Sequence, residues 1–139
     1  MATIRSTIER RVALIDENKT VLDAVDLMTE KYIGSVVVIG SAGIKGLFTE
    51  RDLVMKIVAQ RRDPAIVKLR DAMPATLLKV SPDESCNHCL DLMQQHRCRH
   101  LLVFEGEEFV GLVSLRDLVA LMLEEKEELI AQLKQYIAG

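Results

Sequence analysis

A hydroxyl and a carboxylate stand three residues apart at two places in the chain, Thr49 with Asp52 and Ser114 with Asp117. Each pair follows an apolar run and opens an amphipathic stretch, a pattern typical of a strand that leads into a helix. The free N–H groups at such a helix start can bind an anion, and the hydroxyl can donate to a phosphate oxygen. A carboxylate one turn into the helix can accept from the hydroxyls of a ribose. This spacing therefore indicates nucleotide binding.

The same pairs also have a purely structural interpretation. A hydroxyl followed three residues later by an acid forms a helix N-cap, because both side chains satisfy N–H groups that lack a partner at the helix start. A single copy of the pattern is most simply a cap. Gly46 and Gly111 stand three residues before each hydroxyl and lack a Cβ, so we expect a ligand to have room against the backbone there.

The two stretches are copies of each other. Gly46-Leu47-Phe48-Thr49-Glu50-Arg51-Asp52-Leu53-Val54 returns 65 residues later as Gly111-Leu112-Val113-Ser114-Leu115-Arg116-Asp117-Leu118-Val119. The same offset places Arg5 on Arg70 without a gap. An ungapped register over roughly fifty residues indicates two copies of one supersecondary unit. We therefore divide the chain into residues 1–66 and residues 67–139.

Each copy predicts the order strand, helix, strand, strand, helix from its apolar periodicity and its Gly and Pro breaks. Asp16 is the predicted N-cap of the first helix, and Ser81 with Glu84 forms a predicted capping box for its counterpart. The last helix meets no breaker before Gly139, so it is expected to extend past its counterpart. One such sheet with two helices cannot close a core alone. The expected fold is α/β (α+β), with two βαββα units related by a pseudo-two-fold axis and their sheets packed together.

The composition sets the class of protein. Of the 139 residues, 49% are hydrophobic and only 4% aromatic, so the core must be aliphatic. A net charge of −3 gives no general attraction for nucleic acid. The first twenty residues carry several charges and lack the apolar segment of a signal peptide, and no apolar run is long enough to span a bilayer. With three cysteines and no secretion signal, we expect a cytoplasmic protein with reduced thiols and no membrane partner.

Ser35-Val36-Val37-Val38 followed by Gly46–Leu53 closely resembles the CBS (cystathionine beta-synthase) domain, and Arg99-His100-Leu101-Leu102-Val103 followed by Gly111–Leu118 resembles it equally. The pair is similar to a tandem CBS or Bateman module that covers nearly the whole chain. The resemblance implies two clefts between the copies that bind adenosine-containing ligands: AMP, ADP, ATP, S-adenosylmethionine or NAD-type molecules. It also implies a regulatory sensor that signals to a protein partner by conformational bias, with no catalysis and no catalytic cofactor.

The resemblance assigns roles to individual residues. Asp52 and Asp117 would hold the ribose hydroxyls, while Thr49, Ser114 and Arg116 would lie near ribose or phosphate. The base pocket would combine the helix-to-strand segment of one copy with the lead-in strand of the other. Its implied members are Ala13, Ile33, Gly34, Ser35, Leu78, Cys98, Arg99, His100 and Leu112.

Basic residues distinguish the two predicted sites. Arg97, Arg99, His100 and Arg116 all fall in the second copy near its motif, so we expect the Asp117 site to be the better anion site. The alternative interpretation of these four residues is an ordinary solvated surface.

A zinc site is a competing hypothesis, since Cys86, His88, Cys89 and Cys98 could supply four ligands. The repeat argues against it, because the three cysteines align with apolar residues of the first copy and so take core-type positions. His88 falls on a helix face that we expect to be exposed. No nucleophile–base pair and no Gly-Lys-Ser/Thr phosphate loop supports an enzyme.

The last helix has two interpretations. Its apolar stripe either folds back on its own module or packs on a second copy. The stripe is formed by Leu118, Met122, Leu129, Leu133 and Tyr136. We predict a homodimer to which this helix contributes, as the resemblance also implies. The alternative function is a dimerisation or interaction scaffold whose clefts bind nothing.

Overall fold

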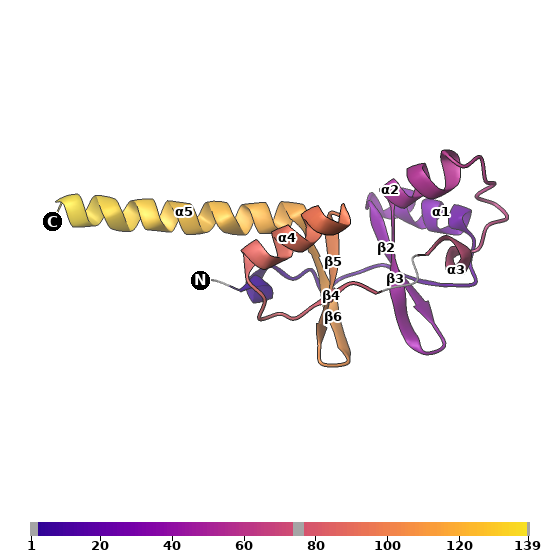
Figure 1. Cartoon of the computed structure of the whole chain (residues 1–139), viewed down its shortest axis with the longest axis horizontal. Helices are drawn as coiled ribbons and strands as arrows, with labels where there is room; N and C mark the ends of the chain where they lie inside the picture. Colours follow the sequence, from indigo (N-terminus) through magenta and orange to yellow (C-terminus); the bar gives the residue numbers. More distant parts are fainter. Residues whose placement is uncertain (1–2, 74–76, 139) are drawn as a thin grey trace. The chain divides into compact units, whose positions relative to one another are not determined.

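A computed structural model of the chain describes residues 3–73 and 77–138 (Figure 1). The chain divides into two compact units, Arg11–Leu78 and, from both ends of the chain, Met1–Arg10 with Lys79–Gly139. Each unit contains one three-stranded sheet with its helices, so the fold is mixed α/β, as predicted. Among the described residues no helix combines the length and the apolar character needed to cross a bilayer.

The unit Arg11–Leu78 is built on a sheet with strand order β1-β2-β3. β1 runs parallel to β2, whereas β2 and β3 form an antiparallel hairpin. The central part of β2, Val36–Val38, is buried because both faces of the strand are covered. The elements of this unit are β1 (Leu14–Asp16), α1 (Val21–Lys31), β2 (Ser35–Gly40), β3 (Gly43–Thr49), α2 (Glu50–Asp52), the π-helix η2 (Leu53–Val58) and α3 (Leu69–Ala72).

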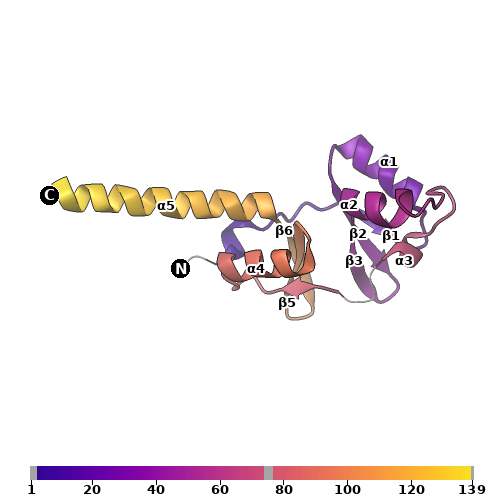
Figure 2. The same cartoon turned by 45° about the horizontal axis from the view of Figure 1, so that its top comes forward.

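The second unit repeats this plan with strand order β4-β5-β6. Its elements are the 3-10 helix η1 (Ile4–Thr7), β4 (Lys79–Val80), α4 (Cys86–His96), β5 (His100–Glu105), β6 (Glu108–Ser114) and α5 (Leu115–Ala138). α4 lies beside the first turns of α5, and the rest of α5 extends past the sheet of this unit (Figures 1 and 2). The predicted order of strand, helix, strand, strand, helix is therefore confirmed in both copies.

Both cores are mainly aliphatic, as the composition predicts, and Phe48 is the one aromatic residue among the buried core residues of the described chain. In the first unit α1, β2, η2 and α3 bury their apolar side chains around Phe48, which is fully buried. The equivalent position in the second unit is Val113, which is also fully buried. Replacing a ring by a branched aliphatic side chain at this position means that the two cores cannot be packed identically.

Each unit takes its leading segment from the other sequence copy. Residues 3–9, which we call the strap, contain η1 and pack on the second copy, where the Ile4 N–H donates to the Glu84 carbonyl at 3.0 Å. The equivalent helix α3 packs on the first copy, where the Leu69 N–H donates to the Lys19 carbonyl at 2.9 Å. The two bonds are related by the 65-residue offset. The predicted copies, 1–66 and 67–139, describe the repeat in sequence, whereas the compact units exchange these segments.

The predicted helix starts are wrong by about one turn. α1 begins after Thr20 and not after Asp16, and the Thr20 hydroxyl accepts from the Asp23 N–H at 3.1 Å. α4 begins after Ser85 and not after Ser81. Ser81 instead accepts from the Asp83 N–H within the preceding turn.

The exchanged segments explain the late starts. In a helix that began one turn earlier, the carbonyls of Lys19 and Glu84 would accept from N–H groups of the same helix. α3 and the strap take these two carbonyls instead. Each helix therefore begins at the next residue with a hydroxyl that can cap it.

Candidate ligand site

In the first unit, Thr49 and Asp52 form a reciprocal cap at the junction of β3 and α2. Asp52 Oδ2 accepts from the Thr49 N–H at 3.0 Å and from the Thr49 hydroxyl at 3.1 Å. The Asp52 N–H in turn donates to Thr49 Oγ1 at 3.2 Å. The other carboxylate oxygen, Oδ1, lies 3.3 Å from Lys56 Nζ. Both oxygens of the Asp52 carboxylate are therefore engaged within the protein.

The second unit has the same cap without the ion pair. The Ser114 N–H donates to Asp117 Oδ2 at 3.1 Å, and the Asp117 N–H donates to Ser114 Oγ at 3.1 Å. At the position of Lys56 the second copy has Leu121, which is buried. Within residues 3–73 and 77–138, nothing bonds to Asp117 Oδ1 and the Ser114 hydroxyl has no acceptor. This junction keeps one carboxylate oxygen and one hydroxyl proton available.

The segment predicted for the first base pocket, Ile33–Ser35, meets the first cap. The Gly34 carbonyl accepts from the Glu50 N–H at 3.0 Å, and Ser35 pairs with Thr49 across the hairpin. Ile33 and Gly34 also line a hollow of about 420 Å³ between the end of α1 and the start of α2. The structure thus brings these three residues next to the Thr49 cap.

The corresponding segment of the second unit, Cys98–His100, is arranged in the same way. The Arg99 carbonyl accepts from the Leu115 N–H at 2.8 Å, and His100 pairs with Ser114 in the hairpin. Cys98 is half-buried, and the Arg97, Arg99 and Arg116 side chains are exposed. The first copy has no basic residue at the positions of Arg97, Arg99 or His100. The second junction is therefore the more basic of the two.

Three other residues predicted for the base pockets lie along the sheets and not at the caps. The Ala13 carbonyl accepts from the Val37 N–H at 2.8 Å, at the start of β1. Leu112 is buried in β6, opposite Leu102. Leu78 is half-buried directly before β4. A role for these residues in a base pocket stays a prediction.

The space over the motif glycines is filled by the chain itself, so the expectation of a ligand there is wrong. A Cβ on Gly111 would overlap the Glu9 carbonyl oxygen and would lie 2.9 Å from Ile8 Cγ2. A Cβ on Gly46 would lie 2.7 Å from Cε of Met73, the residue equivalent to Ile8. Packing requires glycine at position 111, because the backbone of the strap lies directly over the strand there, whereas the atom close to Gly46 is the end of the flexible Met73 side chain and can move.

The strap contacts the second motif through residues that the sequence analysis did not single out. Glu9 and Leu112 exchange two backbone hydrogen bonds of 2.8 and 2.9 Å, which extend the free edge of β6. The Thr7 hydroxyl donates to the Asp117 carbonyl at 3.5 Å. The match of Arg5 with Arg70 indicates that the repeat includes this segment, but a repeat cannot indicate which copy the segment packs on.

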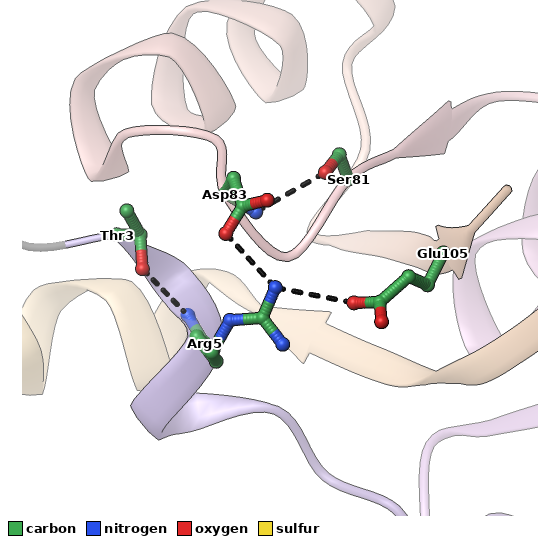
Figure 3. A network of polar contacts seen from close by, with 5 residues as sticks. All are labelled: Thr3, Arg5, Ser81, Asp83 and Glu105. Atoms are coloured by element: carbon green, nitrogen blue, oxygen red, sulfur yellow. Dashed lines mark hydrogen bonds and ion pairs between the residues drawn. The ribbon is translucent and has the colours of Figure 1, made fainter.

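Arg5 anchors the strap to two parts of the second copy. Its guanidinium lies between the carboxylates of Asp83 and Glu105 (Figure 3). Arg5 Nη2 is 2.9 Å from Asp83 Oδ1 and 3.1 Å from Glu105 Oε2. These hydrogen bonds raise the pKa of Arg5, that to Asp83 contributing most, so the guanidinium stays charged. All three side chains are exposed, so the ion pairs orient the strap more than they stabilise the fold.

Cys86 and Cys89 lie in the core, as the repeat predicts, whereas Cys98, for which it predicts the same, is only half-buried. Both are buried, and the Cys86 thiol donates to the Leu118 carbonyl at 3.4 Å. Burial raises the pKa of Cys86 and raises the pKa of Cys89 to about 11. The His88 side chain is 52% exposed on the opposite side of α4. The described part of the chain contains no group of three or more His, Cys, Asp or Glu residues placed to hold a metal ion.

We expect Cys86 and Cys89 to resist alkylation by iodoacetamide in the folded protein at pH 8. The thiolate is the reactive form, and a raised pKa keeps both groups protonated while burial blocks access. Intact mass spectrometry should find at most one adduct, on the half-buried Cys98, before denaturation and three adducts after it. Two or more adducts on the folded protein would contradict this assignment.

The motif, its strand pairing and its duplication can now be compared with known families. The model of the CBS domain matches two stretches of the sequence, residues 4–59 and residues 69–124. The chain belongs to the CBS domain family. It is a pair of CBS domains, a module of regulatory and signal-transduction proteins. Each match begins with a leading segment, η1 or α3, and includes one of the two motif caps, Thr49 with Asp52 or Ser114 with Asp117.

Several relatives resemble this CBS pair over most of its length. CBS domain-containing protein YhcV of Bacillus subtilis is 30% identical over 118 residues, which cover 85% of this chain and 84% of that protein. Mitochondrial CBS domain-containing protein CBSX3 of Arabidopsis thaliana is 34% identical over 125 residues, which are 86% of this chain but only 61% of that protein. A solved structure of a putative signal-transduction protein with CBS domains from Burkholderia ambifaria superposes with a TM-score of 0.82 at 34% identity, covering 88% of this chain and 95% of that one.

Proposed function

We propose that this CBS pair is a regulatory sensor that binds an adenosine-containing ligand at the junction of β6 and α5. One observation carries the proposal: the Asp117 carboxylate uses Oδ2 for the helix cap and leaves Oδ1 without a partner among the described residues. That oxygen can accept from a ribose hydroxyl, while the Ser114 hydroxyl can donate to a phosphate. CBS domains typically bind adenosine ligands, which supports this choice of ligand class.

The second junction is a better candidate than the first for two reasons. A ligand at Asp52 would have to displace Lys56 from Oδ1, whereas Asp117 has no such ion pair with any residue that the structure describes. α5 is an uninterrupted helix of 24 residues, whereas α2 has three residues before the π-helix η2 begins. The helix dipole and the exposed Arg99 and Arg116 side chains therefore favour an anion at the second junction.

The strap gives ligand binding a way to signal without catalysis. The Thr7 hydroxyl bonds to the carbonyl of Asp117, and Glu9 is paired with Leu112 two residues before Ser114. A ligand that reorients the start of α5 would change these contacts and so bias the position of the strap, which a protein partner would then read. In this proposal the protein binds and signals, and no bond of the ligand is broken.

A ligand panel tests the proposal directly. We expect AMP, ADP, ATP, S-adenosylmethionine or NADH to raise the melting temperature by several degrees, because a ligand at about a hundred times its Kd adds roughly 2.7 kcal/mol to stability. The 2′,3′-dideoxy form of the active nucleotide should give a much smaller shift, because it lacks the hydroxyls that Asp117 would bind. A flat response to the whole panel would support the alternative function, an interaction scaffold with empty sites.

We also propose that the CBS pair forms a homodimer. The proposal is supported by the number of large apolar side chains of α5 that remain exposed in the single chain. Analytical ultracentrifugation at micromolar concentration should give twice the chain mass of 15.6 kDa.

A further inference from the structure

From Leu123 to Ile137, α5 carries an apolar stripe that covers nothing among the described residues of its own unit. Tyr136 is 86% exposed and Ile137 84% exposed, and four other apolar residues of this stripe are more than half exposed. These four are Leu123, Leu129, Ile130 and Leu133. Together with Lys126 the apolar residues of this stripe form two rows along the helix, 123-126-130-133-137 and 126-129-133-136, whose alternating spacing of three and four residues is that of a seam between two paired helices. The stripe therefore has the pattern of a helix that packs on another helix.

A hollow of about 590 Å³ lies beside this stripe, between α4 and α5. Cys86 and Asn87 line it from α4, and Met122, Lys126 and Leu129 line it from α5. Glu125 also faces the hollow, and its Oε1 is shielded from solvent without a hydrogen-bond partner among the described residues.

A shielded carboxylate oxygen without a donor costs free energy, so the hollow is suited to a group with an apolar body and one donor. A tyrosine side chain has both properties.

We propose that α5 pairs antiparallel with α5 of a second copy, and that Tyr136 of each copy fills the α4–α5 hollow of the other. An antiparallel overlap of the seam sets Lys126 opposite the partner's Tyr136 and Leu129 opposite the partner's Leu133. The partner's phenol would then lie beside Glu125 and could donate to its free oxygen. The chain's own Tyr136 cannot do so, because ten residues of continuous helix place it about 15 Å along the axis from Lys126.

Charge selects the antiparallel orientation. In a parallel pair Lys126 would face Lys126 of the partner chain within the seam. The four glutamates between residues 124 and 128 would likewise face the four equivalent glutamates of the partner chain. In the antiparallel pair Glu127 lies across from the partner's Lys134, and this contact occurs twice by symmetry. Lys126 meets the ring of the partner's Tyr136, an arrangement that favours a cation over an aromatic face. The antiparallel overlap therefore separates the two acidic blocks and gives each copy one Glu–Lys contact and one Lys–Tyr contact.

Single cysteine variants test the orientation, because Ile130 lies next to the proposed two-fold axis while Leu123 and Ile137 lie far from it. Under mild oxidation we expect Ile130→Cys to form a covalent dimer. Leu123→Cys and Ile137→Cys should not cross-link alone but should cross-link when the two variants are mixed. The unmodified chain, whose three cysteines are at least half-buried, gives the baseline. Self-cross-linking of all three variants would establish a parallel pair and overturn the proposal.

Affinity measurements test the role of the hollow. Sedimentation should show that Tyr136→Ser raises the dimer dissociation constant at least tenfold, whereas Tyr32→Ser, at the other exposed tyrosine of the chain, leaves it unchanged. The pairing rests on the proposed homodimer and not on ligand binding, and the outcomes separate the two. A monomer at 100 µM overturns both the homodimer and the pairing. A dimer that tolerates Tyr136→Ser and gives no α5 cross-link overturns only the pairing.

Discussion

Asp117→Asn should weaken binding of the adenosine-containing ligand by at least about 1.5 kcal/mol, roughly tenfold, because a hydrogen bond to a charged group is lost. The asparagine oxygen can still accept from the Ser114 N–H and keep the cap at the start of α5. Its NH2 group takes the place of Oδ1 and cannot accept from a ribose hydroxyl. Calorimetry on the folded variant therefore measures the ligand contact, while Asp117→Ala removes the contact and the cap together.

A matched control is available in α1. Thr20 and Asp23 form the same reciprocal cap as Ser114 and Asp117, but at a helix start outside either motif. Asp23→Asn should leave ligand affinity unchanged. Asp52→Asn should have a smaller effect than Asp117→Asn, because Lys56 already occupies the second oxygen of Asp52. Unchanged affinity in Asp117→Asn would show that this carboxylate is only a helix cap.

Gly111→Val should destabilise the protein by about 2–4 kcal/mol, since a side chain there must displace the strap. The added Cβ would overlap the Glu9 carbonyl, which is backbone and cannot rotate away. Two hydrogen bonds between Glu9 and Leu112 would be lost with the displacement. For a chain of this size we expect the melting temperature to fall by roughly 10 °C, measured by circular dichroism or calorimetry.

Two further variants distinguish the steric clash at Gly111 from the general cost of replacing a glycine. A Cβ on Gly43 would meet nothing within 4 Å, so Gly43→Ala reports only the cost of a backbone with φ of 114°. That cost is about 1–2 kcal/mol. Gly111→Ala should lie between the Gly43 variant and Gly111→Val. If Gly111→Val melts within 2 °C of the unchanged protein, the strap does not pack over Gly111 in solution.

The repeat made most of the fold predictable from sequence. Periodicity in each copy predicts the strands and helices, and agreement between the two copies supports segments that are too short to be clear alone. The caps were also predictable, because Thr49 with Asp52 and Ser114 with Asp117 satisfy groups within one turn of the same helix. Because these cap hydrogen bonds join residues only three apart in the sequence, the local sequence pattern is enough to predict them.

The exchanged segments could not be predicted, and the errors follow from them. Nothing local to Ile4 indicates that its N–H bonds to Glu84, which is eighty residues further on. The helix starts at Asp16 and Ser81 were therefore predicted from caps that are locally sound. Gly111 was assigned to a ligand for the same reason: the sequence indicates a close approach to the backbone there, but not that Glu9 makes it.

The difference between the two junctions was present in the sequence but needed the structure to become meaningful. Lys56 stands four residues after Asp52, the spacing of an ion pair on a helix, and Leu121 stands at the same place after Asp117. The prediction of a better anion site at Asp117 rests on the basic residues around the motifs and not on the residue one turn after each acid. The structure shows that this one position decides whether the second oxygen of the carboxylate is occupied.

The position of the strap also sets the order in which the chain can complete its two units during translation. Thr7 and Glu9 leave the ribosome first, yet their contacts, Asp117 and Leu112, are made more than a hundred residues later. The unit Arg11–Leu78 has all its parts once α3 has emerged, whereas the other unit must hold its first residues undocked until almost the whole chain is free. A ribosome stalled just after α3 has emerged would therefore carry one finished unit and an exposed apolar residue, Ile4, with no surface to cover it.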